Sequence, residues 1–286
     1  MAEGVRLVEE ALAAGIAIRG AVVSPALEAT RRGEALKGAL VAAGIKVEHV
    51  DDRALAEGVR LVEEALAAGV PIKGAVVSPA LEATRRGEAL KGALLTAGVR
   101  LETVDDRDLA DLADTEHPQG VLAVIEPRDW SLDDIALTPH AAVLVLDAVQ
   151  DPGNVGTMVR TALALGAAGV VALPGTADLS NPKVIRGAMG ATFRLPCVAT
   201  DAGALAAWAG AKHAEVWITQ VAAEPVPRAP RSAPILMVVG NEGAGVGESM
   251  TAHAFRRVGI PLTPGAESLN VAVAAGILLY EVLRAD

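Results

Sequence analysis

The sequence lacks several features that would place it in other classes of protein. It has one cysteine, Cys197, so no internal disulfide can form and the chain does not require an oxidising compartment. The Leu-Pro-Cys-Val context predicts that this thiol is buried, which disfavours a catalytic role. Aromatic residues make up 2% of the chain and apolar residues 52%, so Ala, Val, Leu and Ile must form the core. This composition is typical of layered α/β domains.

Membrane segments and a strong positive charge are also missing. No apolar run reaches the length of about 18 residues that spans a bilayer, and the N-terminus shows no secretory signal pattern. We therefore expect a soluble, cytoplasmic protein without a membrane partner, and we expect no metal site. The formal net charge of -10 argues against a broad, nonspecific grip on nucleic acid. An RNA partner would have to meet local basic patches, such as Arg31-Arg32, Arg85-Arg86 and Arg256-Arg257.

The front of the chain contains a duplication. Residues 2–55 recur as residues 56–109, and 44 of the 54 paired positions are identical. Within a copy the hydrophobic spacing predicts the order helix, strand, helix, strand. Only the second copy continues, into a predicted strand at residues 120–125. Between the copies, the stretch from Asp51 to Glu64 predicts one long helix that joins them.

Composition and periodicity divide the chain into four parts. Residues 1–55 form an extra repeat unit and residues 56–126 a small α/β domain. The polar segment at residues 127–139 is predicted to be a linker, because it carries Pro and Asp. In residues 140–286 strands and helices alternate, which predicts a mostly parallel sheet covered by helices. The predicted strands are 141–148, 169–173, 214–219, 234–239 and 257–262; the predicted helices are 154–165, 181–189, 201–211, 246–252 and 269–283.

Three strand-to-helix junctions in the last part carry polar residues, and together they predict one pocket. In the first, Asp151-Pro-Gly-Asn154 forms a turn and Asn154 can cap the following helix. Arg160 lies nearly two turns into that apolar helix, so we expect it to bind a charged ligand, to reach solvent, or to pair with Asp147.

The second and third junctions are rich in glycine and in polar side chains, respectively. Gly240-Asn-Glu-Gly-Ala-Gly does not have the Gly-x-Gly-x-x-Gly spacing of dinucleotide loops, which disfavours a Rossmann-type oxidoreductase. Its glycines predict close approach of backbone to a ligand or to another segment, with Glu242 the only charge among them. In the third junction Ser268 and Asn270 precede an apolar helix, which we expect to be buried in the core or at a subunit interface. Both side chains could also be plain helix caps.

These three junctions resemble, in order and spacing, the signature motifs of the SpoU (TrmH-like) branch of the SPOUT RNA 2'-O-ribose methyltransferases. Residues 56–126 are similar to the small α/β substrate-binding domain that often precedes the SpoU domain, up to the ending Thr115-Glu-His-Pro-Gln-Gly. The resemblance implies a trefoil-knotted α/β domain, an exception to the rule that chains avoid knots. It also implies a homodimer that binds S-adenosylmethionine and methylates a ribose 2'-hydroxyl of tRNA or rRNA. The extra front repeat departs from this plan at the RNA-binding end.

The resemblance also assigns roles to residues. It implies Arg160 as the catalytic residue, surrounded by four further side chains, Asn154, Glu242, Ser268 and Asn270. For the cofactor it implies Gly240, Asn241, Gly243, Ile260 and Leu269.

The chemistry is consistent with these roles. A ribose hydroxyl must lose its proton as it attacks the sulfonium methyl, so it needs a base and tight alignment. Arg160 normally stays protonated, so we expect it to orient the hydroxyl and a phosphate. The proton acceptor is then a phosphate oxygen, Glu242 or an arginine of lowered pKa. A noncatalytic RNA-binding protein, or an engineered scaffold that keeps the fold, is the alternative from another class.

Overall fold

The computed structural model contains two compact units, residues 1–53 and residues 54–286. It describes residues 8, 12–13, 21–23, 31–45, 47–49, 54–113, 115–226 and 233–284. None of the helices in these ranges combines the length and the apolar character that a membrane span requires.

The described part of the first unit contains two strands and one helix. Strands β1 (Ala21–Val23) and β2 (Val47–His49) pair in parallel, and helix α3 (Arg31–Ala42) connects them. The pairing Ala21↔Val47 is the counterpart, 54 residues earlier, of Ala75↔Leu101 in the second unit.

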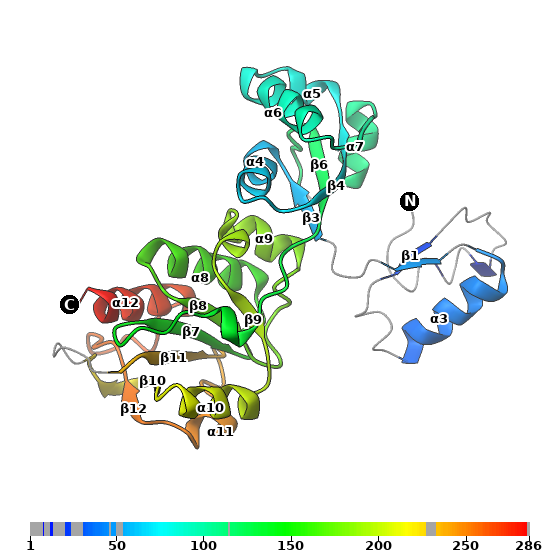
Figure 1. Ribbon diagram of the computed structural model, residues 1–286. Coiled ribbons are helices and arrows are strands. Elements are labelled where there is room, and N and C mark those ends of the chain that lie inside the picture. Colours follow the sequence, from blue (N-terminus) through cyan, green and yellow to red (C-terminus); the bar gives the residue numbers. More distant parts are fainter. Residues whose placement is uncertain are drawn as a thin grey trace. The chain divides into compact units, whose positions relative to one another are not determined.

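The second unit begins with a four-stranded sheet in the order β3-β6-β4-β5 (residues 54–126; Figure 1). We call it the substrate-binding part, after the domain that its sequence resembles. Strand β6 pairs antiparallel with β3 and β4, whereas β4 and β5 are parallel. The predicted strands and helices of the second copy are present here. The elements are β3 (Ala54–Glu57), α4 (Val59–Ala67), β4 (Ile72–Val77), α5 (Pro79–Glu82), α6 (Arg85–Thr96), β5 (Leu101–Thr103), α7 (Asp106–Leu112) and β6 (Val121–Ile125).

The long helix predicted across residues 51–64 is wrong. Ala54–Glu57 forms strand β3, and residues 51–53 lie outside the described residues. Gly58 ends the strand with a φ of 93°, a conformation that glycine adopts readily and that a helix does not contain. Ala54 and Ala56 are buried where β3 pairs with β6, so tertiary pairing overrides the helical spacing.

Residues 142–284 form a six-stranded sheet in the order β12-β10-β11-β7-β8-β9, in which every pair is parallel. The predicted parallel sheet is therefore confirmed. Figure 1 shows α8, α9 and α12 on one face and α10 and α11 on the other. The elements are β7 (Ala142–Asp147), α8 (Pro152–Leu165), β8 (Gly169–Ala172), α9 (Pro182–Ala188), β9 (Cys197–Ala199), α10 (Ala202–Ala211), β10 (Glu215–Glu224), β11 (Ile235–Gly240), α11 (Glu248–Thr251), β12 (Arg256–Val258) and α12 (Val271–Leu283).

The central strands explain the continuous apolar runs in the sequence. Every residue of β7 and β11 is buried, because helices cover both faces of the sheet. Strand β9 was not among the predicted strands; its three residues are too few to show a periodicity.

The segment predicted as a linker, residues 127–139, is ordered and packed. It contains a short 3₁₀ helix at Leu132–Asp134 with a capping box between Ser131 and Asp134. Ile135 is buried against the sheet, and Arg128 stacks on the ring of Trp130 at 4.0 Å.

The two parts of the second unit share a core. Ile185 of α9 and Phe193, in the 3₁₀ helix Ala191–Phe193, belong to the same buried cluster as Val62 and Leu94 of the substrate-binding part. Two ion pairs, from Arg186 to Glu57 of β3 and from Arg194 to Glu64 of α4, also join the two parts.

Candidate active site

Sheet topology explains why the three junctions meet. All strands of the six-stranded sheet are parallel, so the loops that follow their carboxyl ends lie at one edge. Strand β7 lies between β11 and β8, and the chain order reverses at the β11–β7 pair. Ligands of open α/β sheets bind at such a reversal point. The first two junctions leave β7 and β11, and the third leaves β12 at the end of the sheet.

The loop after β11 is held tightly against the end of β7. Asn241 donates its amide to the Ala148 carbonyl at 3.0 Å, and its Oδ1 accepts the backbone N–H of Gly243 at 2.8 Å. Asp147 is buried and its carboxylate accepts the Gly247 N–H at 2.7 Å. Ala148 has a φ of 56°, which is uncommon for a residue with a side chain and indicates a constrained backbone.

Gly240 shows why this loop needs glycine. A Cβ there would lie 2.1 Å from the Gly245 carbonyl carbon and 2.3 Å from the Val246 nitrogen, both backbone atoms. The loop therefore folds directly over the end of β11, as the glycine-rich sequence predicted.

A chain of hydrogen bonds joins the three junctions. The amide of Asn154 donates to Glu242 Oε1 at 2.7 Å, and the amide of Asn270 donates to Asn154 Oδ1 at 3.1 Å. Asn270 also caps α12, because its Oδ1 accepts the N–H groups of Ala272 and Val273. The helix cap predicted for Asn270 is therefore present. Asn154 does not cap α8; Asp151 does, by accepting the Asn154 N–H at 2.7 Å.

A cavity of about 570 Å³ opens beside this chain of hydrogen bonds. Its volume is within the range of small-molecule sites. Glu242 and Ser268 line it. All five residues predicted to hold the cofactor line it as well: Gly240, Asn241, Gly243, Ile260 and Leu269. Sequence reasoning missed Thr219 and Gln220 of β10, and it named Arg257 of β12 as part of a basic patch for RNA; all three line the cavity. Only the neighbouring positions of these strands in the sheet reveal them.

Arg160 stands apart from this group. It is exposed on α8 and does not line the cavity, and its side chain forms no hydrogen bond or ion pair with the described residues. Six helical residues separate it from Asn154, which corresponds to about 9 Å along the helix axis and a different face. The alternative pairing with Asp147 is wrong, since Asp147 holds Gly247 instead.

The cavity fits S-adenosylmethionine chemically. The backbone of the glycine-rich loop can approach the flat adenine ring closely. Apolar walls are provided by Ile260, Leu262, Leu269 and Leu278. Glu242 supplies a negative charge beside the space, which suits a cofactor that carries a sulfonium and an ammonium group.

The described residues also include a thiol and side chains of the kinds that bind metal ions. Burial raises the pKa of the Cys197 thiol to about 12, so the thiol is neutral near pH 7 and a poor nucleophile. Among the described residues no three His, Cys, Asp or Glu side chains are grouped to hold a metal ion.

The comparisons with known proteins agree with this architecture. The SpoU rRNA Methylase family matches residues 141–280, and the RNA 2'-O ribose methyltransferase substrate binding family matches residues 55–131. The 23S rRNA (guanosine(2553)-2'-O)-methyltransferase RlmP of Bacillus subtilis is 36% identical over 229 residues, which are 80% of this chain and 87% of that protein. The 23S rRNA (uridine(2479)-2'-O)-methyltransferase of Streptomyces viridochromogenes is 30% identical and covers 80% of this chain and 82% of its own length.

Solved structures show the same fold. The SpoU methyltransferase AviRb from Streptomyces viridochromogenes, in complex with AdoMet, superposes with a TM-score of 0.72 at 27% identity, covering 91% of this chain and 95% of that one. An AdoMet-bound rRNA methyltransferase from Sinorhizobium meliloti has the same TM-score at 28% identity, with coverage of 92% and 98%.

The fold and the site thus define an S-adenosylmethionine-dependent RNA 2'-O-ribose methyltransferase. The chain belongs to the SpoU family.

Proposed function

We propose that this enzyme methylates a ribose 2'-hydroxyl of 23S ribosomal RNA, with Glu242 as the proton acceptor and Arg160 as the residue that binds the adjacent phosphate. The hydrogen-bonded chain Asn270–Asn154–Glu242 carries the proposal, since it joins three separate segments at the rim of the cofactor cavity. The choice of 23S rRNA rests on the relatives, whose names specify that RNA.

S-adenosylmethionine, when bound, supplies the methyl group on its sulfonium. The residues of the chain have the tasks of orientation and proton transfer. Asn154 holds Glu242 through Oε1, and Oε2 has no hydrogen-bond partner among the described residues, so Oε2 is free to accept the hydroxyl proton. Asn270 fixes Asn154 from the other side, which keeps the carboxylate in one orientation. Arg160 has a planar guanidinium suited to a phosphate.

The test is transfer of labelled methyl from S-adenosylmethionine to an unmodified 23S rRNA transcript, followed by nucleoside analysis. Glu242→Gln keeps an oxygen that can accept from Asn154 but cannot take up the proton. We expect turnover to fall about 10²- to 10⁴-fold, with cofactor affinity almost unchanged. Full turnover of Glu242→Gln would assign the proton to a phosphate oxygen or to an arginine instead.

Arg160 variants test the other assignment. Arg160→Ala should abolish transfer, and Arg160→Lys should lower it strongly because lysine lacks the bidentate geometry. Cofactor binding without transfer in the wild-type protein would favour the noncatalytic RNA-binding alternative.

We further propose that the enzyme is a cytoplasmic homodimer that packs through α12. Val273, Ile277 and Tyr280 lie on one stripe of that helix and are 52%, 38% and 51% exposed. Leu269, 38% exposed, extends this apolar surface to the cofactor cavity. Light scattering should give twice the chain mass, and Tyr280→Glu should shift it toward the monomer. A wild-type monomer at micromolar concentration contradicts the dimer.

The family's trefoil knot and a structural duplication complete the proposal. The knot rests on the resemblance of the chain to the SpoU family. The equal registers of β1–β2 and β4–β5 support the duplication, and so does the burial of Leu36 and Leu40. Their counterparts Leu90 and Leu94 are buried as well. The proposed parts of the chain are an extra repeat unit at residues 1–55, an RNA-binding domain at 56–126, a linker at 127–139 and the methyltransferase domain at 140–286.

A further inference from the structure

A second cavity, of about 660 Å³, lies where the substrate-binding part meets α9. Three arginines from three helices line it: Arg60 of α4, Arg86 of α6 and Arg186 of α9. Among the lining residues Glu57 is the single carboxylate. We call this space the arginine groove. It is separate from the cofactor cavity, with which it shares no lining residue.

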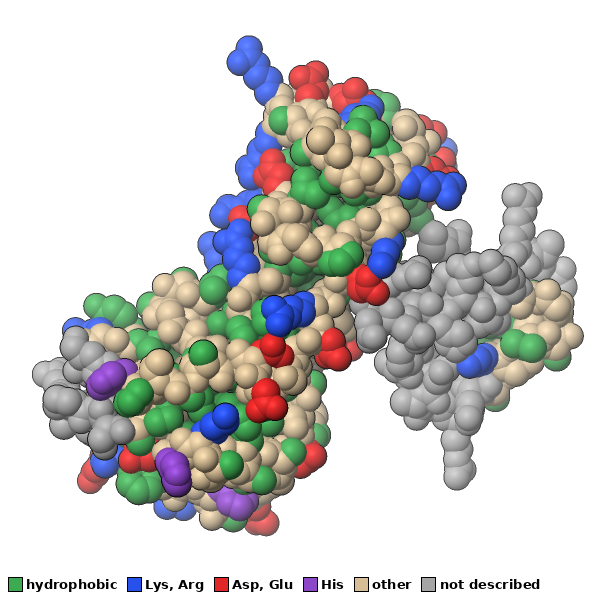
Figure 2. All heavy atoms as spheres, in the orientation of Figure 1, with side chains coloured by type: hydrophobic (Ala, Val, Ile, Leu, Met, Phe, Trp, Pro, Cys, Tyr) green, Lys and Arg blue, Asp and Glu red, His purple; other side chains and the backbone are tan. Residues whose placement is uncertain are grey.

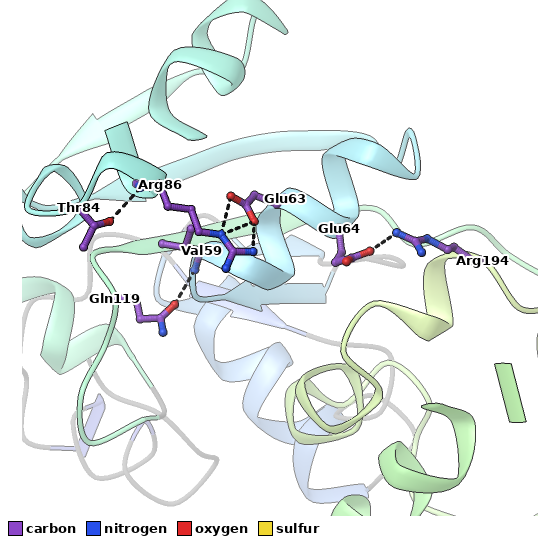
Figure 3. A network of polar contacts seen from close by, with 8 residues as sticks. Val59, Glu63, Glu64, Thr84, Arg86, Gln119 and Arg194 are labelled. Atoms are coloured by element: carbon purple, nitrogen blue, oxygen red, sulfur yellow. Dashed lines mark hydrogen bonds and ion pairs between the residues drawn. The ribbon is translucent and has the colours of Figure 1, made fainter. Parts of the chain in front are cut away.

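Carboxylates hold two of the three arginines in place. Arg86 Nε lies 2.9 and 3.0 Å from the two oxygens of Glu63, as Figure 3 shows. Arg186 Nη1 lies 3.3 Å from Glu57 Oε2. These pairs orient the guanidinium groups.

Arg60 is different, because it has no such partner. It is exposed and forms no ion pair or side-chain hydrogen bond with any residue that the structure describes. Its positive charge is therefore available to a ligand in the groove.

The N-terminus of α4 also faces the groove. Its cap residue, Gly58, has no side chain to accept the first N–H groups of the helix. Gln119 accepts the Val59 N–H at 2.9 Å, which leaves the following N–H groups at the helix start without a side-chain cap (Figure 3). The partial positive charge at this end adds to that of the arginines and favours an anion.

We propose that the arginine groove binds a backbone phosphate of the substrate RNA, with Arg60 as the direct ligand and Arg86 and Arg186 beside it. The inference rests on the proposed function and adds to it a contact that reaches both parts of the unit. The lining contains no Phe, Tyr or Trp, and His117 is its one aromatic ring, so the groove offers cations to the RNA backbone more than stacking surfaces to a base.

The surroundings favour a long polyanion over a free nucleotide. Figure 2 shows Lys and Arg side chains gathered along one edge of the substrate-binding part. Arg86 is 60% exposed at its side chain, so a chain of phosphates can reach it from outside. An overall charge of -10 makes such a local positive edge the natural place for RNA to bind.

The duplication provides a matched control. Arg6 occupies the same position in the first copy as Arg60 in the second, and Arg32 the same position as Arg86. The repeat ends at residue 109, so the first copy has no sequence counterpart of the loop at residues 115–119 or of α9. Arg60→Glu and Arg6→Glu change the net charge equally but only the first alters the groove.

The experiment measures binding of the full-length protein to an unmodified 23S rRNA transcript at several salt concentrations. Arg60→Glu should weaken binding about tenfold or more at 100 mM salt and reduce the slope of log K against log salt by about 0.7 to 0.9 for each lost phosphate contact. Arg6→Glu should stay within about twofold of wild type. Arg86→Ala should weaken binding more than Arg32→Ala. Inorganic phosphate at 5 mM should compete only weakly.

Each outcome decides the question. Equal losses for Arg60→Glu and Arg6→Glu, no loss in either, or no RNA binding by the wild type overturn the groove. Strong competition by 5 mM inorganic phosphate would show a site for a free anion instead. Binding of S-adenosylmethionine, measured in parallel, should be the same in all variants. If the wild-type protein transfers no methyl group but still binds RNA in a way that depends on Arg60, the proposed function is refuted and the RNA-binding groove is supported.

Discussion

Replacement of Gly240 by alanine should disrupt the cofactor cavity from its floor. The added Cβ would lie 2.1 to 2.3 Å from backbone atoms of Gly245 and Val246, and backbone cannot rotate away as a side-chain end can. The loop from Asn241 to Val246 must therefore move. Overpacking of this kind costs about 1–3 kcal/mol. If the cost falls on the cofactor-binding conformation, affinity for S-adenosylmethionine should drop about 5- to 150-fold.

Isothermal titration with S-adenosylmethionine measures the change, and thermal melting verifies that the variant is folded. Gly210→Ala in α10 is the matched control, since a Cβ there would meet no atom within 4 Å and Gly210 does not line the cavity. Its affinity should stay within about twofold of wild type, well inside 1 kcal/mol. Equal affinities for the two variants, or an unchanged affinity for Gly240→Ala, would refute the argument that the loop's close approach to β11 shapes the cavity.

Three further predictions follow from single contacts. Asn154→Ala removes a hydrogen bond to the Glu242 carboxylate, which is worth about 1.5–3 kcal/mol. In the methyl-transfer assay kcat should therefore fall about 10- to 150-fold, while the affinity for the cofactor stays the same. An unchanged kcat would show that Asn154 does not position Glu242. Burial raises the pKa of Cys197 from 9.0 to about 12, so the neutral thiol stabilises the fold below pH 9 and this stabilisation is lost as the pH rises toward 12. The melting temperature of the wild type should thus fall more steeply than that of Cys197→Ala between pH 8 and 11, and parallel curves would contradict the burial. Ile185→Ala, at a side chain 1% exposed, should cost about 2–5 kcal/mol in urea unfolding, whereas Arg194→Ala, which breaks a half-exposed ion pair, should cost at most about 1 kcal/mol; a reversed order would mean that the shared core does not hold the two parts together.

Local patterns in the sequence were sufficient for most elements of the second unit. The order of helix, strand, helix and strand predicted for the second copy is present as α4, β4, α6 and β5, and the apolar runs of β7 and β11 predicted strands buried on both faces. These patterns are local because burial on two faces, or on one stripe of a helix, leaves its period in neighbouring residues.

The errors came where a partner distant in sequence decides the conformation. Ala54–Glu57 is a strand because β6, some 65 residues later, pairs with it, and the sequence near it reads as a helix. The predicted pairing of Arg160 with Asp147 is wrong for the same reason, because Asp147 accepts the N–H of Gly247, 100 residues later.

The sequence by itself determined the family, the alternation of strands and helices, and the residue types at the three junctions, because these depend on residues within one segment. The tertiary structure alone decided that Asn154, Glu242 and Asn270 form one hydrogen-bonded chain, since 88 and 116 residues separate the bonded pairs. It alone also brought Arg60, Arg86 and Arg186 to one groove. Arg60 and Arg86 come from helices of the four-stranded sheet, whereas Arg186 comes from α9 of the six-stranded sheet. Such convergence depends on strand order and helix packing, which leave no local mark on the chain.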